Sequence, residues 1–353
     1  MDNIQNILEH LFRQAALVDR TIRIMEICGT HTVAIQRAGI RSLLPKNIKL
    51  ISGPGCPVCV TPAGYIDALI ELAGRKDVVI ATYGDMVRVT GSKSSLAAQR
   101  AEGRNVQVVV SASDGLAFAM ENPGKQVVFA GVGFETTTPP TADVILRADQ
   151  KTIRNFSALT AHKLVIPAIE ALLVSPTCAI DGFLCPGHVS VLIGADAYKP
   201  IAEKFLRPCV VAGFDALQII AAIDRIVSQV VEKQSLVENI YSAVVKPEPL
   251  LSAKKLVDEV FATVDTEWRA LGIIPESGLA IKSRYGEFDS QKKFHISIPV
   301  VADPPGCRCA EVIQGLIDPV DCPLFGRRCT PIDPVGPCMV SSEGACQAWY
   351  KYS

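Results

Sequence analysis

Four closely spaced cysteines lie near the C-terminus, in a stretch rich in proline and glycine. They are Cys322, Cys329, Cys338 and Cys346. Four thiolates in a short, loop-forming segment are typical of a four-iron (4Fe-4S) cluster, and a zinc ion with four cysteine ligands is the alternative. The paired Cys-x-x-Cys knuckles that are usual for zinc are missing here. The spacing therefore predicts an iron-sulfur cluster.

A second group of cysteines lies before a predicted helix that begins near Pro62. Cys56 and Cys59 form a Cys-x-x-Cys pair there, and Cys28 ends the preceding predicted strand. Peptide dipoles at a helix N-terminus lower the pKa of a thiol and favour the thiolate, which binds metal and acts as the nucleophile. Because neighbouring parallel strands lie close together, we expect Cys28 to face the pair and to complete a site of three soft ligands for iron, zinc or copper(I). By spacing alone, a redox disulfide between Cys56 and Cys59 is about as common as a metal site.

Glycines accompany both of these thiol motifs. Gly29 follows Cys28, and Gly55 precedes Cys56. Glycine at such positions indicates that another group comes close to the backbone.

Two histidines stand at predicted strand ends. His31 lies three residues after Cys28, and its role is open between a metal ligand, a proton carrier and a partner that orients Cys28. His188 follows Pro186-Gly187 and is a candidate for the same cleft, with a capping or core role as the alternative. The segment 131–137 offers backbone amides to an anion, but it lacks a complete nucleotide-binding motif.

The remaining cysteines have weaker signals. Cys307 and Cys309 either form a redox pair with the cluster or are ordinary buried thiols. Cys178, Cys185 and Cys209 lie in apolar strand contexts, where cysteine usually packs as a small hydrophobic residue. A chain of this length needs no disulfide scaffold, so its twelve cysteines favour metal binding or thiol chemistry.

The elements that must position these residues alternate between strand and helix. Helical stretches such as 63–73 and 216–231 follow most of the predicted strands. The short β-branched runs begin near Ile22, Ile48, Val78, Val106, Val127, Phe156, Gly182 and Val210. Eight such units form either one barrel or two open parallel sheets of four strands. The segment 124–133 resembles the beginning of a second domain and favours the two sheets. The motifs then lie beyond the carboxyl ends of the strands, in a cleft between the sheets.

The predicted fold is therefore α/β, with two doubly wound parallel-sheet domains and a C-terminal iron-sulfur domain. We assign residues 20–123 to the first α/β domain and residues 124–250 to the second. The third domain takes residues 251–353 together with an N-terminal helix at 1–19. We expect one helix from Ser252 to Leu271, followed by a glycine- and proline-rich tail that bound metal keeps ordered.

The composition excludes several classes of protein. The chain has 353 residues, a net charge of -1 and 49% hydrophobic residues, which indicates a globular protein with more than one core. Scattered basic residues give no electrostatic footprint for nucleic acid or an anionic membrane. No secretory signal and no apolar run of membrane-spanning length is present, so we expect a cytoplasmic protein.

Five motifs together resemble the HypD family of nickel-iron hydrogenase maturation proteins, over nearly the whole chain. The motifs are Cys-Gly-Thr-His-Thr at 28–32, Gly-Pro-Gly-Cys-Pro-Val-Cys at 53–59, Gly-Phe-Glu-Thr-Thr at 133–137, Pro-Gly-His-Val-Ser at 186–190, and Cys-Pro-Leu-Phe-Gly at 322–326 through Gly-Pro-Cys-Met-Val-Ser at 336–341. The resemblance implies a scaffold on which the iron of a hydrogenase active site acquires two cyanides and one carbon monoxide.

The resemblance also implies partners and residue roles. The partners would be a HypC-type chaperone and a HypE-type donor that carries thiocyanate, with the hydrogenase large subunit served indirectly. The iron-handling residues would be Cys28, Cys56 and Cys59, with Cys28 a direct ligand beside a cysteine of the chaperone. The 4Fe-4S cluster would use the four C-terminal cysteines and supply electrons for reductive release of cyanide.

A different class of function remains open beside this one. The alternative is an iron-sulfur-dependent thiol-disulfide oxidoreductase in which Cys56 and Cys59 cycle between dithiol and disulfide. No hydrolase triad or paired acid-base device is present, which favours a maturation scaffold with redox activity over a metabolic enzyme.

Overall fold

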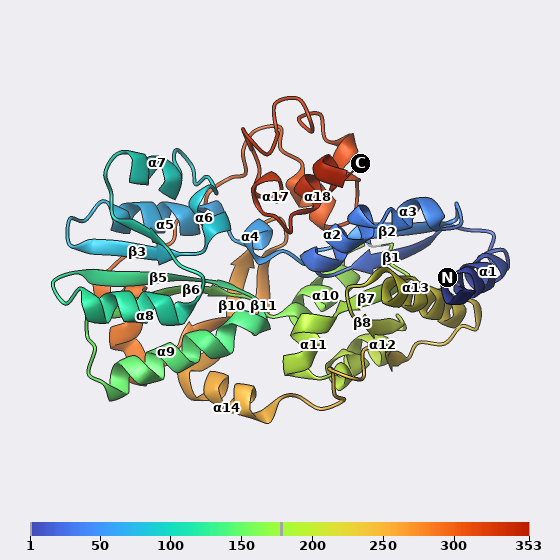
Figure 1. Cartoon of the computed structure of the whole chain (residues 1–353), viewed down its shortest axis with the longest axis horizontal. Helices are drawn as coiled ribbons and strands as arrows, with labels where there is room; N and C mark the ends of the chain where they lie inside the picture. Colours follow the sequence, from blue (N-terminus) through green and yellow to red (C-terminus); the bar gives the residue numbers. More distant parts are fainter. Residues whose placement is uncertain (1, 177–178, 353) are drawn as a thin grey trace.

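Two parallel β-sheets lie side by side in the computed structural model, which describes residues 2–176 and 179–352. Figure 1 shows them as two α/β halves, with the C-terminal segment across the junction between them. We call them sheet A and sheet B. In spatial order, sheet A comprises β2 (Ile48–Ser52), β1 (Ile22–Glu26), β7 (Gly182–Pro186), β8 (Cys209–Ala212) and β9 (Val237–Asn239). Sheet B comprises β4 (Val106–Val108), β3 (Val78–Thr82), β5 (Gln126–Gly133) and β6 (Phe156–His162).

Helices cover both faces of each sheet. The half that contains sheet A carries α1 (Asp2–Ala15), α2 (Gly29–Arg37), α3 (Ile40–Leu43), α11 (Gly187–Ile193), α12 (Lys199–Phe205) and α13 (Ala216–Val231). The half that contains sheet B carries α5 (Ala63–Ala73), α6 (Gly84–Val87), α7 (Leu96–Ala101), α8 (Ala112–Glu121) and α9 (Thr138–Gln150), and α10 (Val165–Leu173) leads from β6 back to sheet A, where it lies beside β7 in Figure 1. The short helix α4 (Pro57–Val60) lies between β2 and α5, η1 (Glu135–Thr137) between β5 and α9, and η2 (Ala195–Tyr198) between α11 and α12. This arrangement confirms an α/β fold with parallel sheets.

Inner strands such as β3 are buried along their whole length and are largely apolar, whereas the edge strand β4 exposes Gln107 and Val108. In β3, Val78 and Ile80 join one hydrophobic cluster, while Val79 and Ala81 join another on the opposite face. Alternate residues of a strand point to opposite faces, so a continuous apolar run is what a sheet covered on both sides requires. Burying each such side chain contributes roughly 1.5–3 kcal/mol, and this packing fixes the strand ends that carry the motifs.

The sequence placed all eight of its strands correctly. Six begin at the predicted residue, and β5 and β8 each begin one residue earlier. The predicted helices at 63–73 and 216–231 are α5 and α13. The short β9 was missed.

The predicted division of the chain at residue 124 was wrong. That boundary separates β3 from β5, which pair directly in sheet B. It also assigns β1 and β7 to different domains, although the two strands pair in sheet A. The crossover from β2 to β3 carries the chain into the second sheet, and the chain returns at β7. Local sequence patterns do not record which strands become neighbours.

The placement of the N-terminal helix with the iron-sulfur domain was also wrong. Its residues Leu11 and Ala15 are buried against Ile219 and Ile223 of α13, in the core beneath sheet A. In Figure 1 α1 lies at the far end of sheet A from the C-terminal segment. An amphipathic helix packs on the nearest apolar surface, and α13 offers one.

The expected helix from Ser252 to Leu271 ends early. The helix α14 (Leu251–Val260) gives way to an antiparallel hairpin of β10 (Phe261–Trp268) and β11 (Gly272–Ile281). β-branched and aromatic residues from Phe261 to Trp268 favour a strand, and the turn before β11 supplies a glycine in the left-handed region at Gly272. The prediction that the helix continues through residues 261–271 was therefore wrong.

The remainder of the C-terminal segment is short helices and loops. They are η3 (Ser283–Phe288), α15 (Ser290–Phe294), α16 (Cys309–Ile313), η4 (Pro319–Asp321), α17 (Pro337–Val340) and α18 (Ala345–Tyr352). α18 packs on α2, and α17 packs on α4, so this segment lies against the two motif loops. Within the described ranges, no helix has the length and apolarity needed to cross a membrane.

Candidate functional site

A cleft of about 850 Å³ lies at the carboxyl ends of both sheets. Its lining includes Cys28, Gly55, Pro186 and His188 from the side of sheet A, and Gly133, Phe134, Thr136 and Thr137 from the side of sheet B. The prediction that these motifs share one cleft between the sheets is confirmed. Parallel sheets place their ligand sites at this edge, where loops lead into helix N-termini.

Cys28 is the thiol that opens into this cleft. It is the N-terminal capping residue of α2, although its side chain forms no capping hydrogen bond. Burial raises the pKa of Cys28 to about 11 and outweighs the opposite effect of the polar groups of His31 and Thr30. The nearby carboxylate of Glu343 raises this pKa further. A soft cation would offset that cost by binding the thiolate directly.

The glycines beside the thiol motifs make room for parts of this same chain. A Cβ on Gly55 would lie 2.2 Å from the backbone nitrogen of Cys28, and a Cβ on Gly29 would lie 2.5 Å from the carbonyl oxygen of Glu343. The amide of Gly29 also donates to the carbonyl oxygen of Gly55 at 3.0 Å. The predicted close approach is therefore backbone against backbone, and it fixes the two motif loops relative to each other.

Cys56 and Cys59 lie together behind the wall of the cleft. The Sγ of Cys59 donates to the Sγ of Cys56 at 2.7 Å, and the amide of Cys59 donates to the same sulfur at 3.3 Å. Both residues are buried, at 4% and 0% exposure, and neither lines the cleft with Cys28. The structure thus pairs Cys56 with Cys59, while the convergence of all three thiols on one point is not observed.

The predicted lowering of the thiol pKa does not hold for Cys59. Burial is the main cause that raises the pKa of Cys59 well above its ordinary value, and the neighbouring thiols of Cys338 and Cys56 add to it. The helix α4 has only four residues, so its dipole is too small to offset the loss of water. The raised pKa favours the protonated thiol of Cys59.

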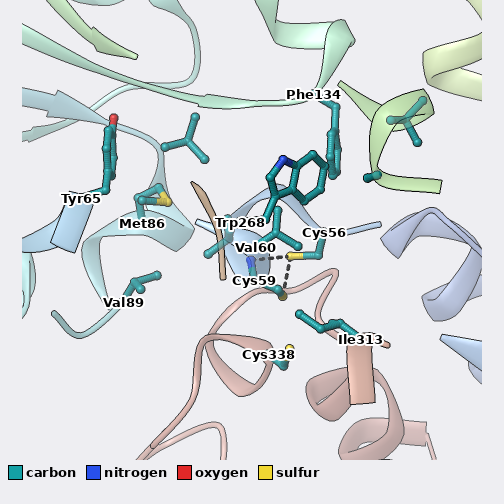
Figure 2. Packing of buried hydrophobic residues seen from close by; sticks show 14 of the residues in the cluster. Cys56, Cys59, Val60, Tyr65, Met86, Val89, Phe134, Trp268, Ile313 and Cys338 are labelled. Carbon is teal, nitrogen blue, oxygen red and sulfur yellow. Dashed lines mark hydrogen bonds between the residues drawn. The ribbon is translucent and has the colours of Figure 1, made fainter. Parts of the chain in front are cut away.

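Cys338 connects this pair to the C-terminal cysteines. Figure 2 shows Cys338 on the C-terminal segment below Cys59 and Cys56, with Ile313 beside them. Cys338 is fully buried, and interactions with the neighbouring thiols of Cys309, Cys346 and Cys59 lower its pKa well below the ordinary value. The contact with Cys309 contributes most to lowering the pKa of Cys338. A row of neighbouring thiols, from Cys346 and Cys309 through Cys338 to Cys59, therefore interacts electrostatically.

The other C-terminal cysteines lie around this row. Cys329 is buried, and its sulfur accepts a hydrogen bond from the amide of Val335 at 3.3 Å. The side chain of Cys307 contacts that of Cys309. Cys322 is half-buried, and no hydrogen bond to its sulfur is found among the described residues.

These residues suit an iron-sulfur cluster by donor type. The C-terminal segment contains six soft thiols, and several of them are shielded from water. A backbone amide donates a hydrogen bond to one of these sulfurs, as is common around iron-sulfur clusters. In the part of the chain that the structure describes, no group of three or more His, Cys, Asp or Glu side chains is arranged around one metal ion. A cluster distributes its four thiolates over four irons, so those thiolates need not converge on a point. Of the four predicted ligands, Cys338 and Cys346 interact with each other, and so does Cys309, which was predicted to be either part of a redox pair with the cluster or an ordinary buried thiol.

His31 is buried away from the cleft. Its Nε2 donates to the carbonyl oxygen of Gly213 at 2.9 Å, and its ring lies 4.8 Å from that of Phe214. Burial lowers the pKa of His31 to about 4, so the ring is neutral near pH 7. These ring contacts involve Gly213 and Phe214 and not Cys28, so the three predicted roles of His31 stay predictions. His188 lines the cleft, with its ring 4.1 Å from Phe214.

A clamp that the sequence analysis missed holds the C-terminal segment in the cleft. The Asp85 carboxylate accepts hydrogen bonds from the Ser342 amide at 2.9 Å, the Ser342 hydroxyl at 3.0 Å and the Ser341 hydroxyl at 3.2 Å. The Thr30 hydroxyl donates to Glu343 at 2.6 Å. These bonds join residues 341–343 to both halves, and only the fold reveals them.

The remaining cysteines behave as expected where the structure describes them. Cys185 and Cys209 are buried on the neighbouring strands β7 and β8, and their side chains contact each other. Cys178 lies outside the described residues. Cys185 and Cys209 are therefore packing residues of sheet A, separate from the cleft.

Comparison with known proteins gives one consistent result. The family model HypD, described as the hydrogenase formation hypA family, matches residues 2–353. The hydrogenase maturation factor HypD of Escherichia coli (strain K12) is 44% identical over 99% of this chain and 95% of its own length. The hydrogenase maturation factor HypD2 of Bradyrhizobium diazoefficiens is 47% identical over 94% of this chain and 89% of its own. The "Putative hydrogenase expression/formation protein" of Methanocaldococcus jannaschii is 40% identical over 99% of this chain and 97% of its own length.

Proposed function

The chain belongs to the HypD family of hydrogenase formation proteins, and from this membership we propose that it acts in hydrogenase maturation as a scaffold for iron. The observation that supports this proposal most strongly is the position of Cys28. It is the one cysteine that lines the cleft among the described residues, and the opposite wall belongs to the other sheet. The cargo is the iron group that carries two cyanides and one carbon monoxide.

The cleft offers the proposed cargo one soft ligand and space for a partner. Cys28 binds iron as thiolate and releases its proton on binding, because metal coordination requires the deprotonated sulfur. A cleft of about 850 Å³ exceeds what a small iron group needs, so the remaining volume accommodates a segment of a HypC-type chaperone whose cysteine is a second ligand. Apolar side chains such as Val132, Phe134 and Val189 line it and exclude water from the cargo.

Cys56 and Cys59 supply the reducing equivalents in this proposal. The HypE-type partner delivers cyanide as a thiocyanate on its own sulfur. Two electrons from the dithiol break the sulfur–carbon bond, which leaves cyanide for the iron and returns the partner's sulfur as a thiol. Cys56 and Cys59 become a disulfide, and of their two protons one protonates the partner's sulfur and the other is released.

The C-terminal cysteines restore the dithiol in this proposal. Cys338 contacts Cys59 on one side and Cys309 and Cys346 on the other, so it connects the pair with the C-terminal group. We assign a 4Fe-4S cluster to this group, with the set predicted from the sequence, Cys322, Cys329, Cys338 and Cys346, as the assignment to be tested. When bound, the cluster supplies single electrons.

Removal of individual sulfurs tests the cluster assignment. Anaerobically purified protein should be brown and contain iron, and serine at a ligand position should reduce both. Serine at Cys209, which lies in sheet A away from the C-terminal segment, is the control and should leave the iron content unchanged. Zinc in place of iron would exclude the cluster. Full iron in a variant would remove that cysteine from the ligand set.

The contact between Cys56 and Cys59 also favours a second candidate, a thiol-disulfide oxidoreductase. This function requires no iron other than the cluster. Metal analysis after replacement of the C-terminal cysteines distinguishes the two functions, because only a scaffold retains iron at Cys28 when the chaperone is bound.

A further inference from the structure

A second cavity, of about 300 Å³, lies beside the cleft and has no role in the thiol chemistry. The short helix η1 separates the two spaces. Thr136 and Thr137 line the cleft, Glu135 lines the cavity, and Leu192 lines both. The walls of the cavity come from α9, α11, α14 and β11, and their apolar side chains include Pro139, Leu164, Ile193, Val257 and Leu279. Cavities of this size and polarity are typical of small-molecule sites.

Glu135 is the acidic group enclosed at the wall of this cavity. Its Oε1 accepts a hydrogen bond from the amide of Val165 at 2.8 Å. Its Oε2 is shielded from solvent and receives no hydrogen bond from any residue within the described ranges. An enclosed carboxylate oxygen without a donor costs free energy, and burial accordingly raises the pKa of Glu135 to about 7. The geometry thus leaves one acceptor at the wall of the cavity without a donor.

The charges at the cavity favour a cation. Besides Glu135, the charged residues that line it are Lys254 and Asp258, both on α14. Lys254 forms an ion pair with Asp258 one helical turn away, so the lysine is already neutralised. The lining therefore carries a net charge of about -1 when Glu135 is ionised, and that carboxylate has no cation of its own.

We infer that this cavity binds a small molecule with an apolar body and a protonated amine, whose ammonium group donates a hydrogen bond to Oε2 of Glu135. A volume of about 300 Å³ is equal to about ten water molecules in the liquid, which limits the ligand to a compact amine. The ligand would contact η1 and Leu192, which also form the wall of the cleft. The inference is independent of the proposed function, since it uses no cysteine and no metal.

Calorimetric titration of the full chain with benzylamine at pH 8 tests the inference. At this pH both the amine and Glu135 are charged. We expect saturable binding with one site, and weaker binding of benzyl alcohol, which has the same ring without the charge. The variant Glu135→Gln keeps the acceptor for the Val165 amide and should weaken benzylamine roughly 10- to 100-fold, as for loss of a hydrogen bond to a charged group.

A second variant keeps the test decisive if Glu135→Gln does not fold. Ala253 lies on the wall of the cavity in the helix α14, and Ala253→Leu would fill part of the space while preserving helix propensity. It should abolish benzylamine binding. Absence of saturable binding to the unaltered chain would overturn the inference, and so would equal affinity in Glu135→Gln or unchanged affinity in Ala253→Leu.

Discussion

Replacement of Gly55 by alanine probes the geometry that holds Cys28 in place. The added Cβ would lie 2.2 Å from the nitrogen of Cys28 and 2.5 Å from the carbonyl carbon of Ile27. Ordinary van der Waals contact begins at 3.4 Å, so the two loops would have to separate by about 1.2 Å. The neighbours are backbone atoms, which cannot rotate away as a side chain does.

The magnitude follows from the two contacts that are disturbed. Overpacking of this kind costs about 1–3 kcal/mol, and loss of the bond between the Gly29 amide and the Gly55 carbonyl adds about 0.5–1.5 kcal/mol. We therefore expect Gly55→Ala to lower the free energy of unfolding by roughly 2–4 kcal/mol. A shift of about 1 Å at Cys28 should also reduce any chemistry that depends on its position by about 100-fold.

Urea unfolding of Gly55→Ala beside a matched control measures this effect. Gly124 lies in a turn, and a Cβ there would meet no atom within 4 Å. Gly124→Ala should therefore change the stability by less than about 0.5 kcal/mol. If both variants unfolded at the same urea concentration as the unaltered chain, the close packing of the two motif loops would be refuted.

Three further predictions concern the clamp, the buried acid and the sulfur row. Asp85→Ala removes three hydrogen bonds and should speed amide hydrogen exchange in residues 338–346 by about tenfold or more. The control Asp114→Ala, which removes a capping bond of α8, should leave exchange in these residues unchanged. Equal exchange in the two variants would contradict the clamp. The folded state raises the pKa of Glu135 from 4.5 to about 7, so its stabilising contribution is complete below about pH 4.5 and is lost as the pH rises through 7. Urea unfolding should show the unaltered chain losing about 3 kcal/mol relative to Glu135→Gln between pH 4.5 and 8, and parallel pH profiles would contradict this burial. Cys338→Ala should slow re-reduction of an oxidised Cys-x-x-Cys pair by dithionite at least tenfold, as followed by thiol labelling, and an unchanged rate would exclude Cys338 from the path.

The sequence predicted local elements well because each strand and helix is encoded in its own apolar pattern. The eight strands and the cleft at their carboxyl ends follow from β-branched runs such as 78–82 and from the position of the motifs after them. The hairpin β10–β11 was missed because its alternation follows directly on a helix without a proline or glycine to mark the boundary. The pairing of β1 with β7 across more than a hundred residues depends on tertiary packing, which no local pattern contains.

The site was predictable in its residue types and less so in its contacts. The motif Cys28 to Thr32 indicated a thiol at a helix N-terminus, and the structure places one there. The prediction of a lowered pKa for Cys59 was wrong, because burial outweighs the dipole of a four-residue helix. The contact between Cys59 and Cys338 joins residues that are far apart in the chain, so sequence spacing could not show it.

Infrared spectroscopy of the anaerobic complex with a HypC-type chaperone tests the central claim most directly. Iron-bound cyanide and carbon monoxide absorb where protein does not. The proposal predicts these bands in the complex of the unaltered chain and of Cys209→Ala, and their loss in Cys28→Ala. Bands of undiminished intensity in Cys28→Ala would contradict the assignment of this thiol as the ligand that holds the iron.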